Sequence, residues 1–571
     1  MKKISSLLLT ALLLAGCASG TETIATAEPT VSETTAAAIP ESTAPTEGNA
    51  YASRFDSETV IVLDDDGITV NGGGETDAVF TSHDIVYYET KTAYSSGNPY
   101  GDGSEADMHT AEEASAHTVV NITAPGAYRL SGTLSAGQIR IDLGADAASD
   151  PEAVVELILD GVDITCTVAP AILFRNVYEC DGDWDAETAQ AEVDTSAAGA
   201  NLILAENSKN TVCGSYVAKI YKDAEGEKKL CKQDGAIYAY MSMNVFGPGA
   251  LDLTAENEGL DTELHLTING GDIAIRADND GINTNEDGVS VTTINGGNLH
   301  IIAGLGAEGD GIDSNGYLVI NGGTVVASAN PASDAGLDSD KGSFVNGGTV
   351  IALGSTMDWA ESNSAQVTMN LQFADYQSGG SAIVVKNGDG NVIFAYDPSE
   401  DEVLGGNARR FQGAVISSPA FVRGETYTVW LDGTVTGEET GGVYAAVTAY
   451  DGGTQMQYTG TDVGRGGMRP NGEKPEGFDG EQPRKGDRPG DLTRPEGEQP
   501  PERPDGETSA TPEGKDFTRG DRPTLPEGET MPEGGPGFVP GGMDSAAGEP
   551  GTEFYMQDMV NAFSGISAVS E

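Results

Sequence analysis

The chain has 571 residues, of which 30 are Lys or Arg and 90 are Asp or Glu, so its formal net charge is −60. This acidity excludes nucleic acid and anionic membrane surfaces as binding partners, because both repel a polyanion. A polyanion also gathers cations, and outside the cell the expected cation is Ca²⁺.

The first residues predict where the protein is found. Lys2-Lys3 precedes an apolar run from Leu8 to Leu14, and Leu14-Ala15-Gly16-Cys17 is a lipobox. The run is too short to span a bilayer and is typical of a cleaved signal segment. We therefore expect residues 1–17 to be a lipoprotein signal peptide with its lipobox, and Cys17 to carry the lipid. The chain would then be extracytoplasmic, anchored to the outer face of the cell membrane.

Two short regions follow. Residues 18–50 are rich in Thr, Ala, Glu, Ser and Pro, a composition that predicts a flexible tether. Residues 51–117 contain strand-like runs, such as Val60-Ile61-Val62-Leu63, and then a polar loop. From residue 118 onward short apolar runs alternate with turn residues, and long 3.6-residue periodicity is absent, so the sequence predicts an all-β body.

A repeat dominates residues 234–350. The triplet Asn-Gly-Gly begins at Asn269, Asn295, Asn321 and Asn346, at intervals of 26, 26 and 25 residues, and each triplet lies between two strand-like runs. A period of this length with several short strands and Gly-rich turns predicts a β-solenoid, in which neighbouring repeats bury the apolar residues that one repeat cannot bury alone. We expect the glycines to supply the positive φ angles of the turns. The solenoid is predicted to span residues 118–354.

The C-terminal part has a different pattern. Strand-like runs over residues 355–462 predict further coils and a strand-rich cap, because a solenoid needs its open end covered. Residues 463–571 are rich in Pro, Gly and Glu, and 15 of the 26 prolines fall between Pro470 and Pro550, which predicts a disordered tail. Within this tail, residues 554–569 are compatible with one short helix.

A second motif interleaves with Asn-Gly-Gly and carries the candidate chemistry. It occurs at residues 258–263, 280–285, 310–315 and 335–340, with a typical form of Asp-Gly-Ile-Asp-Ser-Asn. If the Ile or Leu points inward, strand alternation turns its neighbours outward, and stacking at about 4.8 Å aligns them in columns. One column contains Asp261, Asn283, Asp313 and Asp338; a second contains Glu263, Asn285, Asn315 and Asp340; a third contains Asp280 and Asp310.

These columns predict a metal site. Like charges at that spacing repel unless a cation lies between them, and Ca²⁺ takes six to eight carboxylate, amide and carbonyl oxygens. We therefore predict that the ten column residues bind Ca²⁺. The alternative is that Asp and Asn are turn formers and side-chain ladders without metal.

Four cysteines remain besides Cys17: Cys166, Cys180, Cys213 and Cys231. They allow three disulfide pairings, and the short intervals favour Cys166–Cys180 and Cys213–Cys231. No CxxC or His-containing zinc spacing is present in the sequence, so structural zinc is not expected.

Residues 118–450 resemble the cellulose- and pectate-binding β-helix lipoproteins, a carbohydrate-binding family related in fold to polysaccharide lyases. The resemblance rests on the segments 125–134 and 157–164 and on the repeated Asp-Gly-Ile and Asn-Gly-Gly elements. It implies a right-handed parallel β-helix, bound calcium, and polysaccharide binding without cleavage. Two positions depart from the pattern, because Glu258 and Ala335 replace the usual Asp, and their coils are expected to lack a complete metal site.

Three functions follow. The first is calcium-dependent, non-catalytic binding of polysaccharide such as pectate or cellulose, although none of the three Trp residues falls on the repeat to stack against a flat glycan surface. The second is a calcium-dependent polysaccharide lyase, for which Lys341 beside the columns is the candidate base; pairing of Lys341 with surface acids is the alternative. The third is a structural surface adhesin.

Overall fold

The computed structural model describes the chain over residues 51–89, 103–182, 184–221, 229–355, 359–398, 409–463 and 550–569. Over these residues the protein is nearly all β, with one five-residue helix, α1 (Ala111–Ser115), and one 3-10 turn, η1 (Ala147–Ser149). The all-β prediction is confirmed. The predicted signal peptide, Cys17, the tether and most of the predicted tail lie outside the described residues. No described helix has the length and apolarity that crossing a membrane would need.

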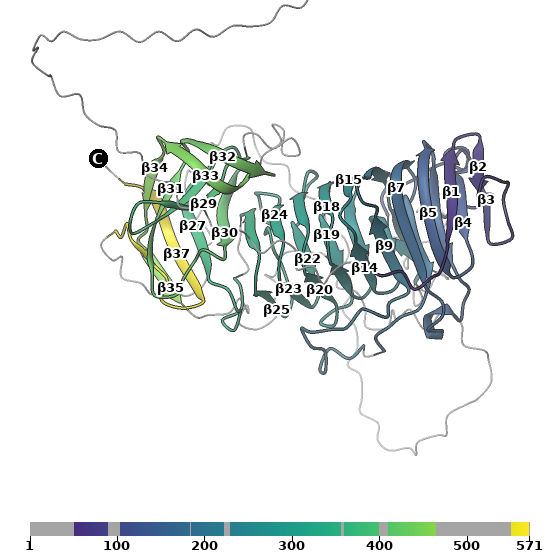
Figure 1. Ribbon diagram of the computed structural model, residues 1–571, viewed down its shortest axis with the longest axis horizontal. Helices are drawn as coiled ribbons and strands as arrows, with labels where there is room; N and C mark the ends of the chain where they lie inside the picture. The colour runs from purple at the N-terminus through teal and green to yellow at the C-terminus, as the bar shows by residue number, and fades with distance from the viewer. Residues whose placement is uncertain are drawn as a thin grey trace, which may run out of the picture. The chain divides into compact units, whose positions relative to one another are not determined.

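Most strands pair in parallel with a strand about one repeat away, and they form three ladders that can be followed in Figure 1. Ladder A begins at β1, upstream of residue 118 where the stack was predicted to begin. Its strands, each paired in parallel with the next, are β1 (Glu58–Asp64), β5 (Gly126–Leu134), β7 (Val155–Cys166), β10 (Lys209–Gly214), β15 (Ala250–Ala255), β18 (Asp272–Ala277), β21 (Asn298–Ile302), β24 (Thr324–Ser328) and β26 (Thr349–Gly354).

Ladders B and C are the other two parallel sets. Ladder B consists of β4 (Thr118–Ile122), β6 (Gly137–Asp142), β8 (Ile172–Asn176), β13 (Gly235–Ala239), β16 (Glu258–Thr262), β19 (Ile282–Thr284) and β22 (Ile312–Ser314). Ladder C starts from the first half of β7 and continues through β9 (Ala200–Leu204), β14 (Met243–Phe246), β17 (Leu266–Ile268), β20 (Val291–Ile294), β23 (Tyr317–Ile320) and β25 (Gly342–Val345).

The apolar residues of the three ladders meet in one core. Leu260, Ile282 and Ile312 of ladder B are each 0% exposed, and they pack in the same cluster as Ile275 of ladder A and Ile294 of ladder C. Each repeat supplies only a few such side chains, so the core is completed by its neighbours along the ladders. Burial of Leu, Ile and Val is therefore what stabilises the stack.

The Asn-Gly-Gly triplets form the turn before each new strand of ladder A. Asn295 donates from Nδ2 to Oδ1 of Asn269 at 3.0 Å, Asn321 donates to Asn295 at 2.9 Å, and Asn346 donates to Asn321 at 3.0 Å. The second glycine of the triplet has positive φ in every copy, for example +92° at Gly297. The predicted use of glycine in these turns is confirmed, because other residues rarely adopt this φ.

The glycine of the Asp-Gly-Ile motif has a different role from the one predicted. Gly259, Gly281 and Gly311 do not have positive φ. Instead, a Cβ added at Gly281 would lie 2.6 Å from the carbonyl oxygen of Gly311, and one added at Gly311 would collide with the carbonyl oxygen of Gly336. These glycines are therefore required because the backbones of neighbouring repeats approach closely.

Short antiparallel elements flank the parallel ladders. β2 (Gly67–Val70) pairs with β1, and β3 (Val79–Ser82) pairs with β4. β11 (Val217–Tyr221) and β12 (Lys229–Gln233) form a two-stranded sheet of their own. This pair is inserted between β10 and β13, so it lies outside the regular repeat.

The strands after ladder A are mostly antiparallel. β30 pairs with β26, the last strand of ladder A, and also with β27, so the antiparallel region continues the stack directly. The strands of this region are β27 (Thr368–Gln377), β28 (Ile383–Asn387), β29 (Val392–Tyr396), β30 (Phe411–Ser417), β31 (Thr426–Leu431), β32 (Thr434–Thr440), β33 (Val443–Asp451), β34 (Thr454–Gln457) and β35 (Gly460–Val463).

The end of the chain returns to this region. The expectation of a short helix within a disordered tail is wrong for residues 554–569, which form β36 (Phe554–Tyr555) and β37 (Val560–Ala568). β37 pairs in parallel with β27 and antiparallel with β35, and its Phe563 is 3% exposed. A partner strand nearly 200 positions away leaves no local signal in the sequence.

The structure contains neither of the favoured disulfides, because Cys166, Cys180, Cys213 and Cys231 are all present as thiols. Cys166 ends β7 and is 1% exposed, pointing into the core, whereas Cys180 belongs to the loop over residues 177–199. Cys213 lies one residue out of register with Cys166, since their ladder partners are Thr165 and Gly214. Neighbouring residues of a strand face opposite sides of the sheet, so Cys213 also points away from Cys166.

Close packing of the repeats can be tested at one glycine. We expect Gly311→Ala to lower the free energy of unfolding by about 1–3 kcal/mol, because its Cβ has no room beside the next repeat. Gly388→Ala is the matched control, since a Cβ there meets nothing within 4 Å. Denaturant unfolding of the two variants gives the comparison, and equal stabilities would contradict the close approach.

Candidate metal centre

Acidic and amide side chains line up on the outward face of ladder B. Asp261 is in register with Asn283, and Asn283 with Asp313. A bridge between Ile312 and Leu337 then places Asp338 at the next position. The structure therefore brings together the first predicted column.

Backbone hydrogen bonds place the other two columns in the same register. The N–H of Asn285 donates to Thr262, that of Asn315 to Thr284, and that of Asp340 to Ser314. At the start of the motif, the N–H groups of Gly259 and Gly281 donate to the carbonyls of Asp280 and Asp310. The second column is thus Glu263, Asn285, Asn315 and Asp340, and the third contains Asp280 and Asp310.

Some of these polar side chains form hydrogen bonds between neighbouring repeats. Oδ1 of Asp280 accepts the N–H of Asp310 at 2.7 Å, and Oδ1 of Asp310 accepts the N–H of Ala335 at 2.6 Å. Asn315 donates from Nδ2 to the carbonyl of Asn285 at 2.9 Å. Asp280, Asp310 and Asn315 therefore have the alternative, structural role as well, because one polar atom of each forms a hydrogen bond to the neighbouring repeat.

The tightest acidic cluster contains two residues that the sequence did not assign. One carboxylate oxygen each of Asp234, Glu258 and Asp261 lie within 4.8 Å of one another. The coil of Glu258 was expected to lack a complete metal site. In the structure Glu258 precedes Asp280 in the third column, and its carboxylate is part of this group. Asp234-Gly235 matches the first two residues of the Asp-Gly-Ile motif, which is the signal in the sequence that could have identified Asp234. In the structure the N–H of Glu258 donates to the carbonyl of Asp234. We call Asp234, Glu258, Asp261 and Asn283 the acidic cluster.

The acidic cluster contains buried oxygens that no hydrogen bond satisfies within the described part of the chain. They are Oε2 of Glu258, Oδ2 of Asp261 and Oδ1 of Asn283. Glu258 is 4% exposed and Asp261 is 0% exposed. A buried oxygen without a partner is costly, and a proton shared between the two carboxylates or a bound cation would offset that cost.

Electrostatics agree with this geometry. Burial raises the pKa of Glu258 to about 7, and the neighbouring Asp234 carboxylate adds to the effect. Burial and Glu258 raise the pKa of Asp261. Further along the columns, burial and Asp313 raise the pKa of Asp280, while burial and Asp338 raise that of Asp313. Without a cation these carboxylates resist ionisation.

A lysine from outside the repeat reaches the acidic cluster. Lys232 on β12 pairs through Nζ with Oδ2 of Asp234 at 2.7 Å and donates to Oδ1 of Asn285 at 2.8 Å. Lys341, the basic residue predicted beside the columns, instead donates to the carbonyl of Ala186 and lies 5.9 Å from the ring centroid of Tyr317. Lys232 could not be predicted from the repeat, because the β11–β12 hairpin that carries it lies outside the repeat.

The donor set fits a hard divalent cation. Carboxylate and amide oxygens are the ligands that Ca²⁺ selects, and the three orphaned oxygens of the acidic cluster are of these two kinds. Ladder B fixes the backbone behind Glu258, Asp261 and Asn283, so the site would be built on paired strands. Asp234, Glu258, Asp261 and Asn283 are the residues that would hold the ion.

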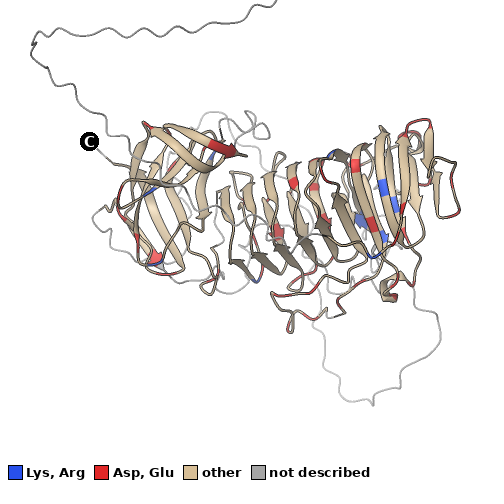
Figure 2. Cartoon of the chain, in the orientation of Figure 1, with Lys and Arg blue, Asp and Glu red and all other residues tan. Residues whose placement is uncertain are grey.

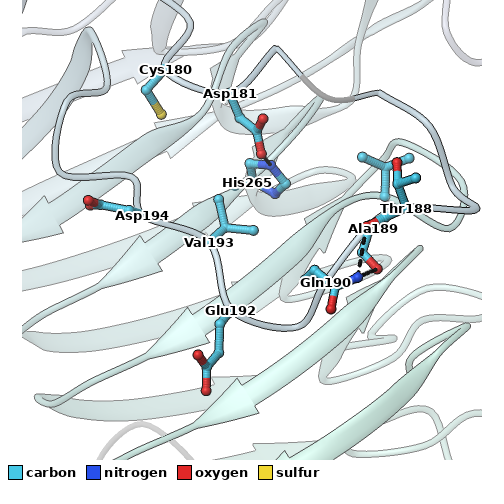
Figure 3. Close-up of a pocket in the computed structure, with 10 residues that line it drawn as sticks. Cys180, Asp181, Thr188, Ala189, Gln190, Glu192, Val193, Asp194 and His265 are labelled. Atoms are coloured by element: carbon cyan, nitrogen blue, oxygen red, sulfur yellow. Dashed lines mark hydrogen bonds and ion pairs between the residues drawn. The ribbon is translucent and has the colours of Figure 1, made fainter.

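A pocket of about 330 Å³ lies between the loop 177–199 and the residues that precede β17 and β20, His265 and Val289. Figure 3 shows His265 directed at Asp181, with Gln190 and Glu192 on the loop nearby. Nε2 of His265 lies 3.2 Å from Oδ2 of Asp181, while Nδ1 accepts the N–H of Val291 at 3.1 Å. His265 follows Glu263 of the second column by two residues, so the pocket adjoins the columns. Its lining offers mainly hydrogen-bond acceptors, which suit hydroxyl groups.

The charge of the described chain is distributed unevenly. Figure 2 shows Asp and Glu on strands and loops throughout, whereas Lys and Arg are far fewer. Arg129 pairs with Glu58 and Asp160, and Arg140 pairs with Asp84, all near the N-terminal end of the ladders. With 90 acidic against 30 basic residues, the chain as a whole favours the binding of cations.

Comparisons with known proteins find similarity to carbohydrate-binding domain-containing proteins. A family model described as carbohydrate-binding domain-containing protein matches residues 116–413, just over half of the chain. A carbohydrate-binding domain-containing protein of Acetivibrio thermocellus is 31% identical over 159 residues, which are 28% of this chain and 45% of that protein. The chain thus spans less than half of this relative's length.

Among solved structures, a gadolinium derivative of the polysaccharide lyase-like protein from C. thermocellum is similar over 51% of this chain and 93% of its own. The sequence identity is 22% and the TM-score is 0.29. A similarity this low supports no structural argument.

The raised pKa of Glu258 predicts a pH dependence in the presence of a chelator. An acid whose pKa is higher in the folded state destabilises the fold when ionised, so this cost is full above pH 7 and disappears as pH falls towards the usual value of 4.5. We expect Glu258→Gln to be more stable than the unsubstituted protein at about pH 8, by roughly 3 kcal/mol at most, and equally stable at about pH 5.

Thermal unfolding in EDTA measures this difference. Asp272→Asn, at an exposed position of β18, is the control and should give no such gain. A Glu258→Gln protein that is less stable at both pH values would show that the Glu258 charge is already compensated.

Proposed function

Because the chain belongs to the family of carbohydrate-binding domain-containing proteins, we propose that it is a calcium-dependent, non-catalytic polysaccharide-binding protein. Two observations carry the proposal. Carboxylate oxygens of Asp234, Glu258 and Asp261 lie within 4.8 Å of one another, and buried oxygens of Glu258, Asp261 and Asn283 lack hydrogen-bond partners within the described residues. When bound, Ca²⁺ would offset most of the negative charge of these carboxylates and so lower their repulsion towards an acidic glycan.

We infer further that ladders A, B and C are the three faces of a right-handed parallel β-helix. Support comes from the parallel pairing of each strand with its counterpart in the next repeat, as between Leu260, Ile282 and Ile312. In such a helix every repeat presents the same outward positions at about 4.8 Å spacing. A polysaccharide lying along the stack would then meet similar side chains several times.

Charge decides which glycans need the metal. A polyuronate such as pectate is repelled by a chain of net charge −60 and requires cations that bridge carboxylate to carboxylate. A neutral glycan such as cellulose is not repelled and can use the hydroxyl-binding pocket beside His265 without a cation. We therefore propose a polyuronate as the calcium-dependent ligand.

A lyase remains the second candidate because Lys232 lies beside the acidic cluster. Such an enzyme removes a proton next to a uronate carboxylate, and this needs an unprotonated base. Burial opposes the charge of Lys232, but the carboxylates of Asp234, Glu258, Asp261 and Glu263 outweigh burial and raise its pKa well above the usual range. In the metal-free protein these carboxylates therefore hold Lys232 in its protonated form, which cannot accept a proton.

We also propose that the protein is held at the outer face of the membrane by lipid on Cys17, as the lipobox implies. A surface position would present the ladders to extracellular polysaccharide. The third alternative, a purely structural adhesin, requires neither the cation nor the glycan.

Calcium-dependent retention is the first test. In affinity electrophoresis through polygalacturonate, we expect the protein to be retarded with CaCl₂ and to migrate freely with EDTA. The Glu258→Gln/Asp261→Asn double variant should lose at least about tenfold in affinity, because two of the charged ligands are gone. Asp272→Asn, on an exposed position of ladder A, should keep full retention.

Retention that ignores EDTA would contradict the calcium dependence. The same incubation is assayed for unsaturated uronate products. Their formation, and its loss in Lys232→Ala, would favour the lyase and overturn the non-catalytic assignment.

Anchoring is tested separately in cells. Cys17→Ala should move the protein from the membrane fraction to the soluble extracytoplasmic fraction, because the thiol that accepts the lipid is gone. Fractionation and immunoblotting measure this, and an unchanged membrane association would disprove the lipid anchor.

A further inference from the structure

Lys232 holds two parts of the acidic cluster at once. Its Nζ lies 2.7 Å from Oδ2 of Asp234 and 2.8 Å from Oδ1 of Asn285. Asn285 in turn donates from Nδ2 to Oδ1 of Asp261 at 2.5 Å. One ammonium group therefore connects Asp234 directly, and Asp261 through an amide, in the space where the carboxylates converge.

The single positive charge of Lys232 does not balance the negative charges of the carboxylates around it. Asp234, Glu258, Asp261 and Glu263 all act on it electrostatically. Yet Oε2 of Glu258, Oδ2 of Asp261 and Oδ1 of Asn283 still lack partners within the described residues. A single ammonium thus offsets part of the repulsion between the carboxylates and leaves several oxygens unsatisfied, which a divalent cation could satisfy better.

We propose that Lys232 is a tethered counter-ion that a divalent cation must displace, and that it thereby sets the affinity of the acidic cluster. This inference rests on the calcium-binding part of the proposed function. A cation bound by Asp234, Glu258 and Asp261 would repel the ammonium and take over the Asp234 carboxylate, so the ion pair of Lys232 breaks as the metal binds.

The position of Lys232 allows this exchange. Its side chain is 22% exposed, whereas Glu258 and Asp261 are 4% and 0% exposed, so the lysine has a route to water that the carboxylates lack. A long, flexible stem lets the ammonium leave without moving the strand behind it. Lys232 therefore reduces the repulsion between the buried carboxylates when calcium is scarce. Because calcium must displace it, Lys232 also lowers the affinity for calcium to a range suited to extracellular concentrations.

Calcium titration by calorimetry on the full chain tests the proposal. Lys232→Met removes the charge but keeps much of the stem, and it should bind CaCl₂ about tenfold more tightly or better. Lys232→Arg keeps the charge and should remain within about threefold of the unsubstituted protein. Lys209→Met, which makes the same charge change at an exposed position of β10, should have no effect.

The outcomes separate this inference from the proposed function. If the unsubstituted protein binds calcium and Lys232→Met binds it equally or more weakly, the counter-ion role is overturned. If only Lys232→Met binds calcium, the counter-ion role is supported while the calcium dependence of the natural protein is overturned. If neither binds calcium, both are overturned. Should Lys232→Met fail to fold, as judged by its thermal unfolding, Lys232→Gln is titrated under the same criteria.

Discussion

In-register pairing of parallel strands is the constraint on which the site depends. Asp261, Asn283 and Asp313 belong to different repeats, yet pairing in ladder B places them at the same position of adjacent strands. The spacing is set by the backbone hydrogen bonds at about 4.8 Å, and side chains cannot adjust it. Acidic residues at a fixed position of the repeat are therefore forced together, whatever their mutual repulsion.

This constraint costs stability, and the protein offsets the cost in different ways along the columns. Asp280 and Asp310 use one oxygen each to accept a backbone N–H of the next repeat. Asp234 pairs with Lys232. Within the described part of the chain, Glu258, Asp261 and Asn283 retain unsatisfied oxygens, and we propose that the cation binds there. A stack built only for stability would carry apolar or amide side chains at these positions, as the ladder from Asn269 to Asn346 does.

The repeat made much of this predictable from the sequence. Periodicity identified an all-β stack and assigned Asp261, Asn283 and Asp313 to one column, because spacing along the chain becomes spacing along the ladder. What the repeat does not contain could not be predicted in this way. Lys232 comes from the inserted hairpin of β11 and β12, and β37 pairs with β27 across most of the C-terminal region. The disulfide prediction failed for a related reason, since Cys166 faces the core and closeness in sequence says nothing about that direction.

The most direct test of the account is a crystal structure of the protein grown with CaCl₂, with anomalous differences measured to locate the ion. We expect an ordered cation about 2.3–2.6 Å from the orphaned oxygens of Glu258, Asp261 and Asn283, with Lys232 turned away from Asp234. A structure in which water or protein N–H groups satisfy these oxygens, with no ion among them at millimolar calcium, would contradict it.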